Sequence, residues 1–373
     1  RRFAEICAAA LAESGVHVHL YDRLCPTPML SFAVRHLHCS AGIVISASHN
    51  TKEYNGIKCY GPDGGQMTEI PAAKVSAAIE TIDLFEPEHL RFEEALEKGL
   101  VTYIPDSVWQ DYYARISREA IYPENVKKAA LRVVYSPLCG AGGEPVSEML
   151  TRLGAELHIP ESQRLPSGEF ASCPTPNPET DSAFDENYKL AAQCRPDIIL
   201  ATDPDSDRIA AAIPVGGGFR KLSGNEMGCL LLDYILRNLR KNGTLPEKPV
   251  AVKSIVSTPL ADRIAAALGC EMRTVLTGFK YIGGVILELE EQGCPERFVL
   301  GFEESCGYLK GDYARDKDAV VTAMLIAEMA ASYKLEGRTL GDVMDGLYDE
   351  YGHFATGLQN VQFTSDAQKE HCM

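Results

Sequence analysis

Long apolar runs are missing from this sequence. Its aliphatic stretches, such as Ile198–Leu200 and Cys229–Leu232, are only a few residues long. A helix needs about 20 consecutive apolar residues to span the hydrocarbon core of a bilayer. We therefore expect no membrane partner.

Basic residues are scarce relative to acidic ones. The 36 Lys and Arg residues stand against 52 Asp and Glu residues, which gives a formal net charge of −16. This charge repels a nucleic-acid backbone unless a local basic patch overcomes it. We therefore discount nucleic acid as a main partner.

Paired cysteine motifs are also absent. The twelve cysteines are scattered singly, without any C-x-x-C spacing. Disulfide frameworks are typical of short secreted chains, whereas dispersed thiols in a large chain suit a reducing compartment. We expect a cytoplasmic protein in which most cysteines act as small buried hydrophobes.

The chain of 373 residues is long enough for two to four domains of roughly 100–200 residues each. Helical periodicity and short apolar strands alternate from the start, over residues 3–11, 16–20, 30–37 and 42–45. The same alternation begins again near residue 131 and near residue 250. It predicts layered α/β domains, with boundaries near residues 124 and 222.

The first polar loop after a predicted strand is Ser46-Ala47-Ser48-His49-Asn50. Loops at the carboxyl ends of strands are where α/β proteins bind ligands. A serine there can act as a nucleophile or carry a phosphoryl group, and the histidine can hydrogen-bond the oxygens around it. Lys58, after the turn pair Asn55-Gly56, could neutralise a phosphoryl charge or carry a proton. Each feature alone is more often an ordinary polar turn or a solvated lysine.

The second loop, Asp203-Pro204-Asp205-Ser206-Asp207-Arg208, places three carboxylates at alternate positions. Carboxylates this close repel one another unless a cation lies among them, and oxygen ligands favour Mg²⁺, Mn²⁺ or Ca²⁺ over zinc. An EF-hand is excluded because its sixth and twelfth positions require Gly and Glu, and here they are Arg208 and Pro214. A solvated or helix-capping acidic turn is the remaining alternative.

The third loop is Gly301-Phe302-Glu303-Glu304-Ser305-Cys306-Gly307, and charged residues follow it up to Asp318. Carboxylate and hydroxyl groups suit sugar hydroxyls, whereas Lys and Arg suit phosphate. One loop could therefore bind both halves of a sugar phosphate, although a charged surface loop is the commoner interpretation of this segment alone.

In this order and at these distances, the loops resemble those of the α-D-phosphohexomutases, the phosphoglucomutase/phosphomannomutase superfamily. Ser46–Asn50 followed by Tyr54-Asn55-Gly56-Ile57-Lys58 is similar to the family's phosphoserine loop, and Asp203–Arg208 matches its metal loop. Thr277-Gly278-Phe279-Lys280 resembles its third-domain loop. The Glu-Glu-Ser form of the third loop is similar to the glucose-type branch.

The resemblance implies three successive α/β domains of similar mixed-sheet topology around a central cleft, over residues 1–123, 124–222 and 223–345. Family members also carry an N-terminal substrate-binding segment and a fourth domain with an Arg-x-Ser-Gly-Thr-Glu-Pro loop that binds the substrate phosphate. Neither is expected here, so we predict that the fourth domain is largely absent and that residues 346–373 are a linker or remnant.

For function, the resemblance implies a phosphohexomutase that interconverts hexose 1-phosphate and hexose 6-phosphate, with glucose first and mannose second. Hexose 1,6-bisphosphate would be its intermediate and activator. Mg²⁺ would be bound by Ser48, Asp203, Asp205 and Asp207. The catalytic residues would be Ser48, Lys58 and His49, and the substrate-binding residues Arg208, Thr277, Gly278, Lys280, Glu303, Ser305 and Lys317. The alternatives are a non-catalytic sugar-phosphate-binding relative and a Mg²⁺-dependent sugar-phosphate phosphatase.

Overall fold

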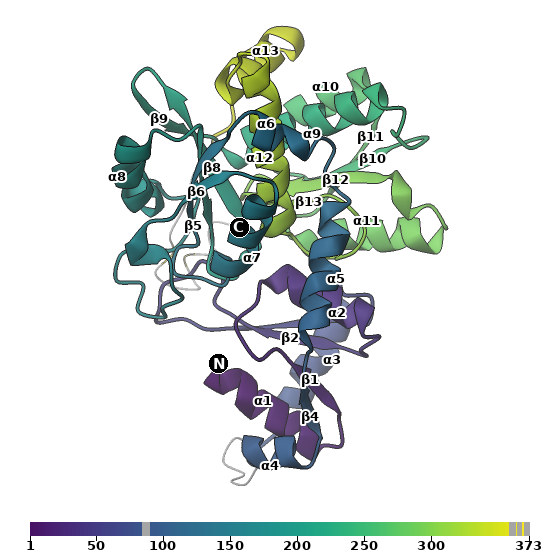
Figure 1. The fold of residues 1–373 in the computed structure, drawn as a ribbon. Helices are drawn as coiled ribbons and strands as arrows, with labels where there is room; N and C mark the ends of the chain where they lie inside the picture. Colours follow the sequence, from purple (N-terminus) through teal and green to yellow (C-terminus); the bar gives the residue numbers. More distant parts are fainter. Residues whose placement is uncertain (84–89, 358–362, 364–367, 369–373) are drawn as a thin grey trace.

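A computed structural model describes residues 1–83, 90–357, 363 and 368. Three α/β units follow one another along the chain (Figure 1). The first lies at the bottom of the view, and the second and third lie side by side above it, with α12 (Ala319–Leu335) running between them. Within the described ranges, no helix is long and apolar enough to cross a membrane.

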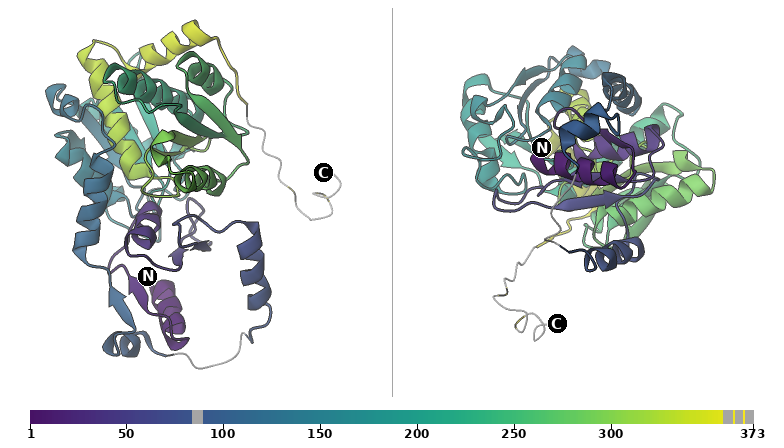
Figure 2. Two further views of the ribbon diagram at one scale, coloured as in Figure 1. Left: turned by 90° about the vertical axis from the view of Figure 1, so that its right-hand side faces the viewer. Right: turned by 90° about the horizontal axis from the view of Figure 1, so that it is seen from below.

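The first unit contains two small sheets. Its elements are α1 (Arg2–Glu13), β1 (Val18–Leu20), α2 (Thr27–His36), β2 (Gly42–Ile45), β3 (Ile57–Tyr60), α3 (Glu69–Ile79), α4 (Phe92–Glu97) and β4 (Val101–Tyr103). Strand β1 pairs in parallel with β4, whereas β2 pairs antiparallel with β3. Helix α3 lies at one side of this unit, away from α1 and α4 (Figure 2). The β2–β3 hairpin places the Ser48 loop and Lys58 beside each other in space.

Two helices connect the first and second units. They are α5 (Asp106–Ser117) and α6 (Glu124–Lys128). Helix α5 buries Trp109 and Tyr112, and the ring of Tyr112 contacts Phe32 of α2 edge-on. These aromatic residues belong to the same hydrophobic core as the second and third units. The first unit is therefore packed against the rest of the molecule on this side.

The second unit is built on a five-stranded mixed sheet of order β6-β5-β7-β8-β9. Its elements are β5 (Arg132–Ser136), α7 (Gly143–Arg152), β6 (Glu156–His158), α8 (Asp185–Cys194), β7 (Ile198–Thr202), β8 (Ile209–Val215) and β9 (Gly218–Lys221), with 3-10 helices η1 (Glu161–Gln163) and η2 (Asp181–Phe184). Strands β5, β6 and β7 are parallel, and β8 returns antiparallel to β7. Every residue of β7 is buried, as its continuous apolar sequence requires. The aspartate-rich loop joins β7 to β8.

The third unit repeats this arrangement with a four-stranded sheet of order β11-β10-β12-β13. Its elements are α9 (Gly224–Lys241), β10 (Val250–Ser254), α10 (Leu260–Ala267), β11 (Glu271–Val275), α11 (Phe279–Glu291), η3 (Pro295–Arg297), β12 (Phe298–Glu303), β13 (Gly307–Leu309), α12 and α13 (Leu340–Tyr351). As in the second unit, the opening strand lies inside the sheet between two parallel neighbours. Helix α12 packs against α6 and α7 as well as α9 and β13.

The prediction of three α/β domains with mixed sheets is confirmed. The domain boundaries stay predictions. Helix α13 extends past the boundary proposed at residue 345 and packs on α9 and β8. Most of the segment after residue 357 lies outside the described residues.

Candidate active site

The aspartate-rich loop lies where the three units meet. The backbone N–H of Thr27, in the first unit, donates a 2.9 Å hydrogen bond to the carbonyl of Asp205. The N–H of Ala319, in the third unit, donates to the carbonyl of Ser206 at 3.3 Å. Ser206 has φ of 53°, in the left-handed region, so the loop turns sharply here. Both neighbouring units therefore contact the backbone of this one turn.

Asp203 folds the loop so that its carboxylates converge. Asp203 Oδ1 accepts hydrogen bonds from the N–H groups of Asp207 (3.1 Å) and Arg208 (2.9 Å). These bonds close the loop onto the end of β7, as an aspartate commonly does in a tight turn. Carboxylate oxygens of Asp203, Asp205 and Asp207 then lie within 4.8 Å of one another, and all three residues are buried.

The chemistry of this cluster fits a hard divalent cation. The Oδ1 atoms of Asp205 and Asp207 are buried and have no hydrogen-bond partner among the described residues. Burial, followed by the charges of Asp205 and Asp207, raises the pKa of Asp203 well above its usual range. An unpaired buried polar group costs about 1–3 kcal/mol, and more when charged. A cation such as Mg²⁺ would bind these oxygens and offset the repulsion.

Two lysines supply positive charge to the cluster. Lys58 Nζ is 2.9 Å from Asp205 Oδ2 and 3.2 Å from Asp207 Oδ2, and Lys317 Nζ is 3.1 Å from Asp207 Oδ2. Burial disfavours the charged form of Lys58, but the carboxylates of Asp207 and Asp205 outweigh it and raise the pKa of Lys58 above its usual value. Burial likewise opposes ionisation of Asp207, but Lys317, Lys58 and Arg208 lower its pKa. The cluster therefore contains ionised pairs.

The Ser48 hydroxyl points into this cluster. Ser48 Oγ donates to Asp203 Oδ2 at 3.2 Å and lies 3.2 Å from His49 Nδ1. The residue has φ of 52°, so the loop after β2 turns at this position. Its N–H donates to Ser46 Oγ at 2.8 Å, and Ser46 Oγ in turn donates to Asp205 Oδ2 at 3.1 Å. The loop is thus attached to the aspartates at two points.

His49 borders the serine, and Arg208 lies close enough for its charge to act on His49. Burial and the charge of Arg208 lower the pKa of His49 to about 4, so its imidazole is neutral at pH 7. Arg208 donates from one terminal nitrogen to Glu179 Oε1 at 2.6 Å. Its Nε is buried without a hydrogen-bond partner among the described residues. A guanidinium with an unused N–H near His49 suits an anionic group held at this site.

Most of the predicted substrate-binding residues come from the third unit. Glu303 is buried and accepts a 2.8 Å hydrogen bond from the N–H of Gly278, which joins the two predicted loops. Burial raises the pKa of Glu303. Ser305 is half-buried in the next turn, and Thr277 is exposed. The groups that could bind hydroxyls therefore come from the loops that follow β11 and β12 of one sheet.

Lys280 has a different partner. Its Nζ donates to Glu69 Oε1 at 2.8 Å, and the hydroxyl of Tyr281 donates to the same oxygen at 2.5 Å. Glu69 begins α3 in the first unit. The structure therefore pairs Lys280 with a carboxylate of another unit rather than with the aspartate cluster.

Several contributors to the site were not predicted from sequence. Thr27 Oγ1 donates to Asp205 Oδ2 at 3.2 Å, Glu179 binds Arg208, and the buried pair Tyr60–Asp316 lies beside the lysines. Thr27, Glu179 and Tyr60 lie at least 29 positions from the residues that they contact. Ser46 and Asp316 did carry a signal, because Ser46 belongs to the Ser48 loop and Asp316 to the charged residues that follow the third loop.

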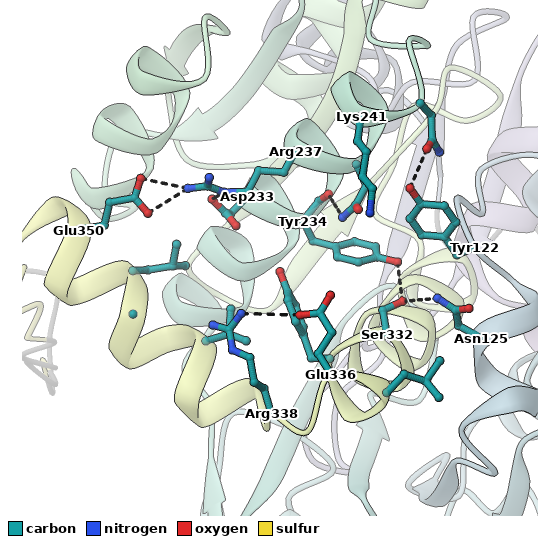
Figure 3. Close-up of a pocket in the computed structure, with 17 residues that line it drawn as sticks. Tyr122, Asn125, Asp233, Tyr234, Arg237, Lys241, Ser332, Glu336, Arg338 and Glu350 are labelled. Atoms are coloured by element: carbon teal, nitrogen blue, oxygen red, sulfur yellow. Dashed lines mark hydrogen bonds and ion pairs between the residues drawn. The ribbon is translucent and has the colours of Figure 1, made fainter.

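The structure also has a pocket of about 830 Å³ between α9, α12 and α13 (Figure 3). Two of its basic side chains, Arg237 and Arg338, pair with acidic side chains of the same pocket. Arg237 contacts Asp233 at 2.7 Å and Glu350 at 3.0 Å, and Arg338 lies 3.8 Å from Glu336. At the aspartate cluster, by contrast, two buried carboxylate oxygens lack a hydrogen-bond partner among the described residues and lie beside a serine hydroxyl, so we assign the chemistry to that cluster.

Comparison with known families accounts for nearly all of the described chain. Residues 1–86, 110–216 and 223–351 match, in order, the families described as phosphoglucomutase/phosphomannomutase, alpha/beta/alpha domains I, II and III.

Individual relatives agree with this match. A phosphoglucomutase of Staphylococcus aureus is 37% identical over 355 residues, which cover 94% of this chain and 62% of the relative. A phosphoglucomutase of Staphylococcus epidermidis is 35% identical over 365 residues, which cover 97% of this chain and 65% of the relative. The chain thus spans less than two thirds of the length of these curated relatives.

Solved structures share the fold. A putative phosphomannomutase from Thermus thermophilus superposes with a TM-score of 0.76 at 24% identity, covering 94% of this chain and 72% of the other. The open form of pp63/parafusin, a phosphoglucomutase from Paramecium, superposes with a TM-score of 0.72 at 20% identity. The match covers 94% of this chain and 65% of the other.

Proposed function

Because this chain belongs to the α-D-phosphohexomutase superfamily, we propose that it transfers a phosphoryl group between the 1- and 6-positions of a hexose phosphate. One observation carries the proposal. The hydroxyl of Ser48 lies 3.2 Å from a cluster of three buried aspartates that is also bound by Lys58 and Lys317. These groups come from all three units. A nucleophile, a cation site and two ammonium groups at one point are what phosphoryl transfer requires.

We assign the cation site to Mg²⁺, bound by Asp203, Asp205, Asp207 and phosphorylated Ser48. The unpartnered Oδ1 atoms of Asp205 and Asp207 support this assignment. When bound, Mg²⁺ supplies positive charge that stabilises the oxygens of the transferring phosphoryl group. The protein contributes the position of these oxygens, which the loop between β7 and β8 fixes.

The transfer step uses groups that this chain provides. A sugar hydroxyl attacks the phosphorus carried on Ser48, the bond between phosphorus and Ser48 Oγ breaks, and a bond to the sugar oxygen forms. The proton of the attacking hydroxyl ends on Ser48 Oγ. We assign Lys58, which is charged in this cluster, to relay it by giving one ammonium proton to Ser48 Oγ and taking up the proton of the sugar hydroxyl. His49 and Arg208 orient the phosphoserine oxygens. In the second half the bisphosphate, turned in the cleft, returns its other phosphoryl group to Ser48.

Substrate recognition would fall to the third unit. Glu303 and Ser305 offer acceptors for the hexose hydroxyls, and Lys317 and Thr277 offer donors for a phosphate. Gly278 would contribute by holding Glu303 through its N–H, and Lys280 would contribute the ammonium hydrogens that its bond to Glu69 leaves free. We propose glucose phosphate as the substrate and mannose phosphate as the alternative substrate. Hexose 1,6-bisphosphate would be the intermediate and the activator. The free thiols of the eleven cysteines in the described part support a cytoplasmic location.

The direct test is turnover. The purified chain is incubated with Mg²⁺, glucose 1-phosphate and a trace of glucose 1,6-bisphosphate, and formation of glucose 6-phosphate is measured beside the Ser48→Ala variant. The proposal predicts isomer formation that Ser48→Ala abolishes. Inorganic phosphate released in excess of isomer would indicate a phosphatase instead. Binding of glucose phosphate without any turnover would indicate a non-catalytic relative.

A further inference from the structure

The loop that carries Lys317 is tied to the first unit through Tyr60. Tyr60 ends β3 and is fully buried, and its hydroxyl donates a 2.6 Å hydrogen bond to Asp316 Oδ2. Asp316 is itself only 3% exposed. A buried bond between a phenol and a carboxylate is charge-assisted, and water cannot replace either partner. This contact therefore sets the distance between β3 and the Lys317 loop.

Asp316 also constrains the residue that follows it. Its Oδ1 accepts a 2.9 Å hydrogen bond from the N–H of Lys317 and lies 3.5 Å from Lys317 Nζ. The lysine stem crosses Gly307, where an added Cβ would lie 2.2 Å from Lys317 Cδ. With its amide and its stem both constrained, Lys317 directs its ammonium to Asp207.

Lys58, the other lysine of the site, is also linked to the hydrogen bond between Tyr60 and Asp316. Lys58 precedes Tyr60 by two residues on β3, and residues i and i+2 of a strand lie on one face. Its Nζ is 3.2 Å from the Asp207 Oδ2 that Lys317 also contacts. Tyr60 thus links strand β3, which carries Lys58, to the loop that carries Lys317.

We propose that Tyr60 and Asp316 are positioning residues that set the spacing of Lys58 and Lys317 around Asp207. The inference rests on the proposed mutase function, in which both lysines act on the substrate. Without the Tyr60 hydroxyl, β3 and the Lys317 loop can shift relative to each other. A misplacement of about 1 Å is enough to slow a transfer step by about 100-fold.

Loss of this hydroxyl leaves the rest of the loop attached. The N–H of Arg315 donates to Ser31 Oγ at 2.8 Å, and the hydroxyl of Tyr313 donates to Asp318 Oδ2 at 2.6 Å. Phenylalanine keeps the ring of Tyr60 in the core. The substitution Tyr60→Phe therefore removes one hydrogen bond and no other anchor.

The experiment measures Tyr60→Phe in two ways: turnover of glucose 1-phosphate, and hydrogen exchange of the amides in residues 312–318. The matched control is Tyr234→Phe, because the Tyr234 hydroxyl also donates to a buried carboxylate, Glu328, at 2.8 Å. Tyr60→Phe should lower kcat by about 10- to 100-fold with KM changed less than about twofold, and should speed exchange in 312–318. Tyr234→Phe should do neither.

A second variant tests the pair itself. Asp316→Asn should lower kcat at least as much as Tyr60→Phe, because it weakens the bond to Tyr60 and also removes the charge beside Lys317. The double variant should be slower than Asp316→Asn by less than the full effect of Tyr60→Phe, because the two residues share one interaction. Unchanged kcat and unchanged exchange in Tyr60→Phe would overturn the proposal, as would equal effects in Tyr234→Phe. If the unmodified chain shows no turnover, that result counts against the mutase, and exchange in 312–318 alone decides the positioning role.

Discussion

Gly140 packs so closely against the aspartate loop that even one added methyl group should disturb the loop. A Cβ added at Gly140 would lie 2.3 Å from Pro204 Cα and 2.5 Å from the Pro204 carbonyl oxygen. Ordinary Cβ contacts begin at 3.4 Å, so one backbone must move by about 1 Å. Both atoms belong to backbone, which has no rotamer to change. Gly140→Ala therefore displaces the loop that carries Asp203 and Asp205.

The size of the effect follows from this shift. Overpacking of a buried contact costs about 1–3 kcal/mol of folding free energy. The N–H of Ala141 also donates a 2.7 Å hydrogen bond to the carbonyl of Pro204, and the same movement strains it. A displacement of about 1 Å at the cation site should lower phosphoryl transfer by about 100-fold. We expect Gly140→Ala to lower the midpoint of thermal unfolding, Mg²⁺ affinity and turnover together.

Gly168 provides the control, because an added Cβ there meets nothing within 4 Å. Thermal unfolding, Mg²⁺ titration by calorimetry and mutase turnover are compared for Gly140→Ala, Gly168→Ala and the unsubstituted chain. Gly168→Ala should match the unsubstituted chain within about 0.5 kcal/mol. The reasoning is refuted if Gly140→Ala folds normally and keeps Mg²⁺ affinity and turnover within about twofold of the control.

Two further predictions concern charge. Asp203→Asn should abolish Mg²⁺ binding and turnover. It should nevertheless raise the thermal unfolding midpoint of the metal-free protein, because it removes a carboxylate whose pKa is raised by burial. A lower unfolding midpoint of the metal-free variant would contradict this prediction. Glu290 accepts hydrogen bonds from Arg35 and from Arg315, and the hydrogen bond from Arg35 is the main cause that lowers its pKa. Since its pKa is depressed on folding, its stabilisation is present above the unfolded pKa and is lost as pH falls through the folded value. Glu290→Gln should thus cost no more than about 1 kcal/mol at pH 7, given its partial exposure, and progressively less as the pH is lowered through the acidic range, as measured by urea unfolding over a series of pH values.

Local sequence patterns predicted the elements that end in the functional loops. The buried strand β7 and the three aspartates after it could be recognised because continuous apolar residues followed by carboxylates have few other interpretations. Strand β3 was not predicted, since Lys58 follows a turn pair in the sequence, whereas in the structure it pairs with Val44 of β2. Short hairpin strands depend on their partner more than on their own composition.

Contacts between units could not be predicted from the sequence. The side chains of Thr27 and Asp205 are separated by 178 positions, and those of Tyr60 and Asp316 by 256. Each is an ordinary residue in its local segment, and its role arises only from how the units pack. The resemblance to a family located the loops, but only the packed structure shows which side chains support them.

The central claim is that Ser48 receives the phosphoryl group beside the aspartate cluster. The most direct measurement is to incubate the chain with glucose 1,6-bisphosphate, with and without Mg²⁺, and to locate the acquired phosphate by peptide mass spectrometry. Our account predicts phosphate on Ser48 only when Mg²⁺ is present, and none in Asp203→Asn. Phosphate on another residue, or its appearance on Ser48 irrespective of Mg²⁺ and Asp203, would contradict it.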